Sequence, residues 1–388
     1  MNTSDQHNKL GVCTCIVFQL SIHLGLFAIG GPIMEAAAQN PPETNTVPTQ
    51  NPVRQMTFVC YKYIDPMTGM EAFRLLMPKG WQATGAITWS ANPALPAQSH
   101  FRFFNPKGHE QFEIFPTQSY FWTNNHMFLM TNPPGSYRFG TLVAQPVNLS
   151  TAFSKTILPT FRSRIRDLKT IERQPLPELA KLAQGPPTTG VNAAAEGGKI
   201  KAEYIQNGQC MEEEIYAVVS QFVTYLPGYF INYWYVDYAF SFRAAKGKLD
   251  EQSKLFQTMA FSLQINPKWF AKVVNTKERM TQMIIQGIQA TGRMGSIIAQ
   301  ASSDMRADQQ TAWEQRQKAK DRLVQNFCDN IRGVQRYHDP FVGKEVELPN
   351  DYGYAWANNL GEYIVTDSPS YNPNIGSNLH WEQIQPVP

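Results

Sequence analysis

The stretch that decides the fold runs from Gly197 to Ile265 and reads GGKIKAEYIQNGQCMEEEIYAVVSQFVTYLPGYFINYWYVDYAFSFRAAKGKLDEQSKLFQTMAFSLQI. Asn207-Gly208 supplies the two left-handed residues that a two-residue hairpin needs, and alternating segments flank it on both sides. Leu226-Pro227-Gly228 marks the next turn. In the strand that follows, alternation predicts one face with Trp234, Val236, Tyr238, Phe240 and Phe242, and an opposite face with Tyr233, Tyr235, Asp237, Ser241 and Arg243.

The hydrophobic period changes after the Lys246-Gly247-Lys248 turn. Asp250 is a suitable helix cap, and an apolar helical stripe follows it, formed by Leu255, Phe256, Met259, Ala260 and Leu263. An apolar sheet face followed directly by such a helix implies that the helix lies across the sheet. Short β-like segments between Met56 and Phe115 complete the same domain. The sequence therefore predicts an α+β fold over residues 56–267, an antiparallel sheet with helices packed on it.

The N-terminal residues 1–38 resemble an export signal. Lys9 is the only basic residue there, and an apolar run from Leu10 to Gly31 leads to Pro32 and the small residues Ala36-Ala37-Ala38. We expect cleavage after Ala38, with an uncleaved anchor as the alternative, and a disordered leader over residues 39–55. The predicted location is extracytoplasmic, either periplasmic or secreted.

The composition excludes some classes of function. A formal net charge of +3 in 388 residues is too mild to indicate nucleic-acid binding. After signal cleavage no remaining stretch is apolar enough to span a membrane. No P-loop, GxSxG elbow, GxGxxG, HExxH or EF-hand loop is present, so the sequence predicts no cofactor and no metal site. Catalytic residues cannot be assigned, and whether the protein is an enzyme stays open, with a non-enzymatic role favoured.

Three cysteines follow the predicted signal: Cys60, Cys210 and Cys328. In an oxidising compartment Cys60 and Cys210 are the candidate disulfide pair, because both fall on predicted strands. Three reduced, buried cysteines are the alternative.

Candidate binding residues lie in an aromatic loop predicted over residues 116–140, which includes Tyr120 and Trp122. Long aromatic loops in compact domains are often functional. The alternative is that these rings cover one end of the sheet.

Residues 148–182 are predicted to be helical, with Ser150 as the cap. Within that segment Arg162, Arg164 and Arg166 are interpreted as a solvated basic face, and Glu212-Glu213-Glu214 as a solvated acidic run. Residues 185–198, rich in Gly, Pro and Ala, are interpreted as a linker or mobile loop.

Apolar residues at helical spacing predict a helical arm over residues 268–335, either one long helix or a helical hairpin. A turn- and β-rich tail, residues 336–388, follows it. Its start, Tyr337 to Gly343, shares the pattern Tyr-x-Asp-Pro-x-x-Gly with Tyr63 to Gly69, which we interpret as two independent hairpin turns.

The tail contains the remaining candidate site. Asp339, Glu362 and Asp367 are acids that can converge beside the aromatic residues Trp356, Tyr363 and Trp381. Carboxylates flanked by aromatic rings are what a sugar site needs, for binding or for acid-base hydrolysis. The alternative is that the aromatic residues anchor the tail to the main domain.

The order of a strand pair, several short strands, a meander and a closing helix resembles the PsbP and Mog1-like α/β fold over residues 56–265. The resemblance rests on the segment Phe73-Arg74-Leu75-Leu76-Met77-Pro78-Lys79-Gly80-Trp81 and on the helix from Asp250 to Leu263. It implies a protein that binds other proteins. The tail is similar to tails of exported bacterial proteins of unknown function. The residues that carry this similarity are Asp339-Pro340, Glu347-Leu348-Pro349, Tyr352, Ala355-Trp356, Gly361-Glu362-Tyr363-Ile364, Asp367, Asn372-Pro373-Asn374 and Trp381.

These observations predict an exported, non-enzymatic binding or scaffold protein of the bacterial cell envelope. Its partner would be another envelope protein or a cell-wall component, and self-association would involve the helical arm. The alternative is a glycan-binding or glycan-hydrolysing protein that uses the acids and aromatic residues of the tail or of the 116–140 loop.

Overall fold

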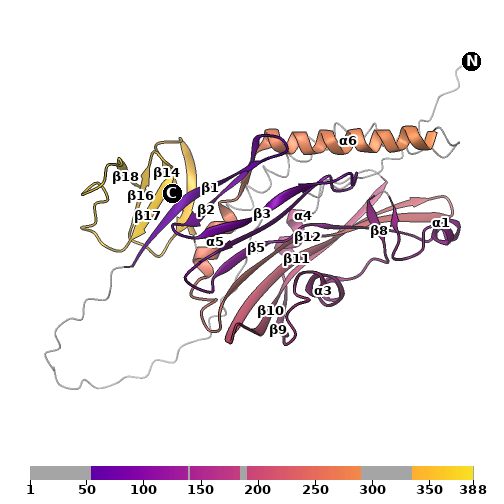
Figure 1. The fold of residues 1–388 in the computed structure, drawn as a ribbon, viewed down its shortest axis with the longest axis horizontal. Coiled ribbons are helices and arrows are strands. Elements are labelled where there is room, and N and C mark those ends of the chain that lie inside the picture. Colours follow the sequence, from indigo (N-terminus) through magenta and orange to yellow (C-terminus); the bar gives the residue numbers. More distant parts are fainter. Residues whose placement is uncertain (1–53, 139, 184–189, 290–333, 388) are drawn as a thin grey trace, which may run out of the picture.

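The computed structural model describes residues 54–138, 140–183, 190–289 and 334–387 (Figure 1). The predicted signal, nearly all of the predicted leader, Cys328 and most of the predicted arm lie outside these residues. The described chain forms two main sheets, antiparallel except for the pair β6 (Gln118–Thr123) and β8 (Thr141–Val143), with helices packed on them. The α+β class predicted from the sequence is therefore confirmed, with the sheets as the larger part.

The larger sheet, sheet B, holds the stretch that decides the fold. Its strands are β3 (Gln82–Trp89), β4 (Ala97–Phe104), β5 (Gln111–Ile114), β6 (Gln118–Thr123), β7 (Tyr137–Arg138), β8 (Thr141–Val143), β9 (Lys169–Pro175), β10 (Val191–Gln206), β11 (Gln209–Leu226) and β12 (Tyr229–Ala245). The order is β3-β4-β5-β12-β11-β10-β9, and β6 continues alongside β12 where β5 ends, with β8 and β7 beyond it.

Both predicted hairpin turns are present. Gln206 pairs with Gln209 across Asn207 and Gly208, whose φ values are +51° and +78°. Leu226 pairs with Tyr229 across the second turn. The two turns lie at opposite ends of sheet B, because each of the three strands that they join spans 16 to 18 residues.

The predicted faces of β12 are wrong beyond Val236. A β-bulge shifts the register between Tyr216 and Val218, and opposite it Tyr238 has φ +48°. The extra residue reverses the alternation, because one inserted residue exchanges the two faces. Trp234 and Val236 consequently lie in a different hydrophobic cluster from Phe240 and Phe242.

The smaller sheet, sheet A, joins the two ends of the described chain. Its strands are β1 (Gln55–Asp65), β2 (Met70–Pro78), β13 (Gln264–Ile265), β16 (Tyr354–Asn358), β17 (Glu362–Thr366) and β18 (Trp381–Ile384). The order is β13-β2-β1-β17-β16-β18, and Phe58 of β1 pairs with Tyr363 of β17. The tail therefore extends the sheet that the opening hairpin begins. A separate hairpin, β14 (Val334–Asp339) and β15 (Lys344–Pro349), packs against it.

The main core lies between sheets A and B. One face of sheet B packs with β2 and with two helices, α5 (Ser253–Phe261) and the start of α6 (Pro267–Gln289). The burial predicted for the apolar stripe is confirmed, since all five residues are buried, four of them in α5 and Leu263 just after its end. The helix begins at Ser253, three residues after the predicted cap.

The opposite face of sheet B is covered by α2 (Leu149–Ala152), the π-helical turn η1 (Phe153–Ile157) and α3 (Leu158–Phe161). Asn148, rather than the predicted Ser150, caps this segment. The helical prediction is wrong for the residues after it, because β9 lies before the short helix α4 (Pro177–Ala183). The predicted linker is also wrong from Val191 onward, where β10 begins. A final short helix, α1 (His126–Thr131), lies at the end of sheet B near β8 (Figure 1).

The predicted helical arm is only partly described. Helix α6 forms its first part, and Trp269 and Phe270 anchor it in the main core. Residues 290–333 lie outside the described residues, so an arm longer than α6 is not supported. Residues 334–335, placed in the arm by the sequence pattern, belong to strand β14.

The two Tyr-x-Asp-Pro-x-x-Gly segments form the same turn. Asp65 Oδ1 accepts a hydrogen bond from the Met67 amide at 3.1 Å, and Asp339 Oδ1 accepts one from the Phe341 amide at 2.8 Å. Gly69 and Gly343 have φ +67° and +63°. The turn chemistry predicted for the motif is therefore present twice.

Candidate functional site

The three acids predicted for a sugar site are each bound by a different local partner. Asp339 accepts a hydrogen bond from the Tyr363 hydroxyl at 2.5 Å, in addition to those of its own turn. Glu362 contacts the Lys79 ammonium at 3.1 Å and the Asn358 amide at 3.0 Å. Asp367 accepts from the Arg54 guanidinium at 3.0 Å. These carboxylates are bound in contacts that hold turns and strands together, which argues against a role in acid-base hydrolysis.

Two of the three predicted tail aromatics, Tyr363 and Trp381, serve packing. Tyr363 and Trp381 are buried, whereas Trp356 is half-buried on β16. Burial, followed by the hydrogen bond to Asp339, raises the pKa of the Tyr363 hydroxyl far above its ordinary value. A neutral phenol buried against a carboxylate fixes the β14–β15 hairpin to sheet A. Rings held in this way are not free to stack on a sugar.

Tyr120 and Trp122, predicted to lie in an aromatic loop, are on strand β6, which pairs with β12. The ring of Tyr120 stacks on Trp234 with 3.9 Å between centroids. Burial raises the pKa of its hydroxyl to about 12. Trp122 is half-buried. The regular part of the supposed loop is therefore core, and only the residues after Thr123 remain as surface.

The predicted disulfide is not formed. Cys60 and Cys210 are both free thiols, and they lie on strands of different sheets, β1 and β11. Burial raises the pKa of the Cys60 thiol, which lowers its reactivity because the thiolate is the nucleophile. Within the described ranges, no group of three or more His, Cys, Asp or Glu side chains is placed to hold a metal ion.

Sequence reasoning missed a buried ion network around Arg162, which was interpreted as part of a solvated face. The Arg162 side chain is 8% exposed and forms ion pairs with Glu213 and, at 2.8 Å, with Glu113. Glu213 also accepts a hydrogen bond from the Tyr204 hydroxyl at 2.9 Å, and His100 Nε2 lies 2.8 Å from Glu113. Long-range strand pairing creates this network, so no local sequence signal could have found it.

The opposite face of the same strands carries a second buried pair. Lys199 Nζ lies 2.5 Å from Glu214, which also accepts a hydrogen bond from the Tyr216 hydroxyl at 2.5 Å. The interpretation of Glu212-Glu213-Glu214 as a solvated run is therefore wrong, since all three are buried. Each of these clusters pairs its charges internally, which favours a role in holding the sheet rather than in chemistry.

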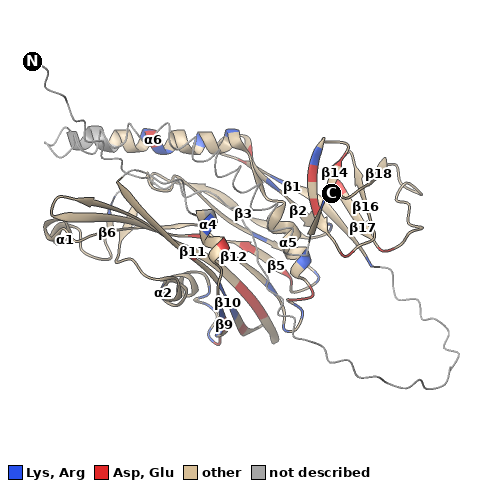
Figure 2. Ribbon diagram, turned by 180° about the vertical axis from the view of Figure 1, so that it is seen from behind, with Lys and Arg blue, Asp and Glu red and all other residues tan. Residues whose placement is uncertain are grey.

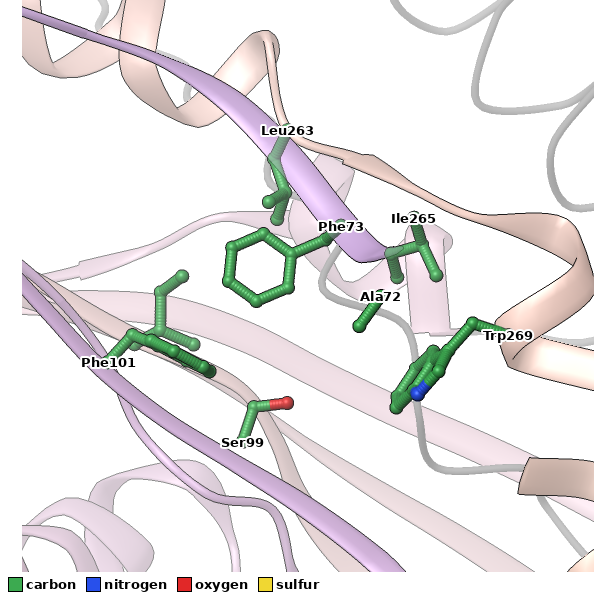
Figure 3. Close-up of a pocket in the computed structure, with 8 residues that line it drawn as sticks. Ala72, Phe73, Ser99, Phe101, Leu263, Ile265 and Trp269 are labelled. Carbon is green, nitrogen blue, oxygen red and sulfur yellow. The ribbon is translucent and has the colours of Figure 1, made fainter. Parts of the chain in front are cut away.

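The cavity shown in Figure 3 lies between the two sheets. Its lining is apolar apart from Ser99 and includes Phe73, Phe101 and Trp269. The cavity volume is about 10 Å³, room for about one water molecule. It is a gap in core packing and is too small for a substrate.

One end of sheet B is almost free of charge. Residues 80–101, 114–137, 182–195 and 215–236 contain no Lys, Arg, Asp or Glu. They contribute the ends of β6, β10, β11 and β12, which reach the same end of the sheet as α1, and most of β3 and β4, which stop nearer its middle (Figure 2). A hydrogen bond of 2.7 Å from the Phe230 amide to Asn124 joins the α1 segment to the end of β12.

Large apolar side chains are exposed at this uncharged end. They are Met127 and Met130 on α1, Tyr137 on β7 and Tyr225 on β11, with exposed fractions of 81%, 72%, 76% and 66%. Helix α1 has no buried residue. We call these four residues the distal surface. Apolar side chains gathered at one end of a protein are typical of a contact site.

Comparisons with known proteins bear on the fold only. No protein-family model and no curated protein matches the chain. No described helix is both long enough and apolar enough to cross a membrane. Among solved structures, the chain is similar to the solution structure of cyanobacterial PsbP (CyanoP) from Synechocystis sp., with 16% sequence identity, 54% of this chain and 93% of that chain covered, and a TM-score of 0.21.

Proposed function

We propose that this chain is an exported, non-enzymatic binding or scaffold protein of the bacterial cell envelope, and that its distal surface contacts a partner protein. The observation that carries the proposal is the exposure of Met127, Met130, Tyr137 and Tyr225 together at an uncharged end of sheet B. Leaving such side chains in water has a cost, which a partner that covers them removes.

The chemistry of the distal surface favours a protein partner with an apolar, uncharged contact area. Interface centres are depleted of Lys, Glu and Asp and enriched in Tyr and Met, which matches this end of the chain. Methionine also adapts its shape to a partner. A bilayer contact normally adds exposed Lys and Arg for anionic headgroups, and this end has only Arg138 over residues 114–154.

The location in the envelope rests on the N-terminal pattern of residues 1–38. Export predicts that the protein isolated from its native envelope begins at Gln39. Intact-mass measurement of that protein tests this part, and a chain that retains residues 1–38 would contradict cleavage.

The test of the distal surface compares two double variants in chemical cross-linking on native envelopes. Met127→Ser with Tyr225→Ser alters the distal surface, and Met67→Ser with Ile375→Ser alters two similarly exposed residues elsewhere, with exposed fractions of 73% and 80%. We expect the intensity of one cross-linked partner band to fall at least tenfold for the first variant and to stay unchanged for the control. Equal recovery from both, or binding to protein-free lipid vesicles that depends on Met127, would refute the proposal.

The predicted helical arm is a second part of this proposal. Helix α6 is buried at Val273, Val274 and Lys277, and its exposed face includes Met283 at 62%. Because the start of α6 and Val334 both belong to the core, a test of the arm has to keep a connection between the end of α6 and β14. Replacement of residues 290–333 by a Gly-Ser linker of the same length is expected to weaken partner recovery or self-association without lowering the unfolding temperature. Unchanged assembly and unchanged partners would count against the arm.

A further inference from the structure

Strand β10 is paired on both sides along only part of its length. Its whole length pairs with β11, from Val191 opposite Thr224 to Gln206 opposite Gln209. On its other side, β9 begins to pair only at Gly198. Among the described residues, no strand pairs with the outer side of residues 191–196. These residues form an open strand edge, which we call the β10 edge.

The structure identifies which backbone groups of the β10 edge face outward. The Leu176 amide donates a 2.7 Å hydrogen bond to the Gly197 carbonyl, so Gly197 presents its polar groups away from β11. The register with β11 is unbroken along β10, and outward and inward residues alternate in an antiparallel strand. Val191, Ala193 and Ala195 therefore point their N–H and C=O groups outward, whereas Asn192 and Ala194 direct theirs to β11.

Lysine, proline, bulges, inward charges and a covering helix or loop are the common protections of a strand edge. Helix α4 packs against Gly197, and Glu196 places a charge next to it. Among the described residues, 191–195 have none of the protections that a sequence can provide. Strand β9, which covers the other half of β10, carries Lys169, Glu172 and Arg173 and a register shift opposite Lys201. Residues 191–195 are Val-Asn-Ala-Ala-Ala, with no charge, no proline and small side chains, and Asn192, Ala193 and Ala194 are exposed.

We infer that the β10 edge pairs with the same edge of a second copy of this chain, so that two sheets B join into one continuous antiparallel sheet. A strand edge related to itself by a two-fold axis places donors opposite acceptors. In a register centred near Ala193, the small uncharged side chains allow close approach, and no like charges meet. An unrelated extended segment could bond to the same backbone groups, but its side chains would not be matched to this edge by symmetry. The inference is independent of the distal surface and of its partner.

Hydrogen exchange on the purified protein at two concentrations, a hundredfold apart, tests the pairing without any variant. The amides of Ala193 and Ala195 should exchange at least tenfold more slowly at the higher concentration, while those of Asn192 and Ala194 stay slow at both, because they already bond to β11. Light scattering should give a dimer mass at the higher concentration. A monomer at both concentrations, or protection of Ala193 that does not depend on concentration, would overturn the inference.

A matched pair of substitutions then tests the edge itself. Ala193→Pro removes an outward N–H, and Ala193→Val keeps it at the same exposed position; an edge tolerates proline where the lost donor faces solvent. We expect the Pro variant to be monomeric and the Val variant to dimerise like the unaltered protein, with equal unfolding temperatures in dilute solution. A dimer that survives Ala193→Pro refutes pairing at this edge. The Met127→Ser and Tyr225→Ser variant should still dimerise, which separates this inference from the proposed function.

Discussion

Arg162 and Glu213 form an ion pair in the interior of the protein, with side-chain exposures of 8% and 0%. Arg162 follows the last turn of α3, and Glu213 lies near the start of β11, 51 residues later. The pair fastens the helical cover to sheet B at its charged end. Removing one partner of such a pair leaves the other charge buried and unpaired, and this strongly lowers the stability of the fold.

Arg162→Met should therefore destabilise the protein strongly. The substitution leaves Glu213 and Glu113 buried without their shared cation, at a cost of about 3–5 kcal/mol in the free energy of unfolding. Urea unfolding followed by circular dichroism measures it. Lys107→Met, in an exposed turn, is the control and should change stability by less than about 0.5 kcal/mol. A loss below about 1 kcal/mol for Arg162→Met would contradict the structural role of the pair.

Stability should fall in acid because of Glu213. Burial alone would raise the pKa of this carboxyl, but the charge of Arg162 and hydrogen bonds from Arg162, Ser241 and Tyr204 outweigh burial and lower it below the ordinary value of 4.5. A lowered folded-state pKa contributes stability above the unfolded-state pKa, and this contribution is lost as the pH falls from 4.5 through the folded-state value.

Unfolding free energies between neutral pH and about pH 3 test this linkage in the unaltered protein and in Glu213→Gln. The variant should be less stable at neutral pH and should lose less stability on acidification. If the unfolding free energies of the two proteins fall in parallel with pH, Glu213 does not control the loss of stability in acid.

The joining of the two chain ends in sheet A predicts a core role for Phe58. This side chain is 0% exposed and packs with the tail residues Tyr337, Ala355 and Val365. Phe58→Ala should cost about 3–5 kcal/mol of unfolding free energy, since it leaves a cavity between the opening hairpin and the tail. Ile375→Ala, at a residue 80% exposed, is the matched control. If both substitutions have equally small effects, the tail does not depend on β1 for its packing.

Cys60 and Cys210 should be recovered as separate thiols. Both are free and lie on different sheets, so alkylation of the unreduced, denatured protein followed by peptide mapping should label each of them. Cys60 should react more slowly in the native protein than in the denatured protein, because burial raises its pKa. A cross-linked Cys60–Cys210 peptide would contradict the arrangement of the two sheets.

Local patterns predicted the elements that depend on neighbours in the chain. The Asn207-Gly208 turn, the Asp65 and Asp339 turns and the buried stripe of α5 were all predictable, because φ preferences, short hydrogen bonds and helical spacing act within a few residues. The same reasoning failed at Tyr238 and at β9. A single bulged residue reverses a strand face without any composition signal, and β9 becomes a strand only because β10 is there to pair with it.

The candidate sites show the same division. The sequence by itself determined the uncharged segments and the aromatic content of residues 114–137 and 215–236. Only the tertiary structure decided that Tyr120 is core and that Met127 and Tyr225 are exposed. It also decided that Asp339 and Glu362 hold structure, that Arg162 meets Glu213, and that Ala193 lies on an open edge. The reason is that burial and strand pairing join residues far apart in the chain, and such contacts leave no trace in local composition.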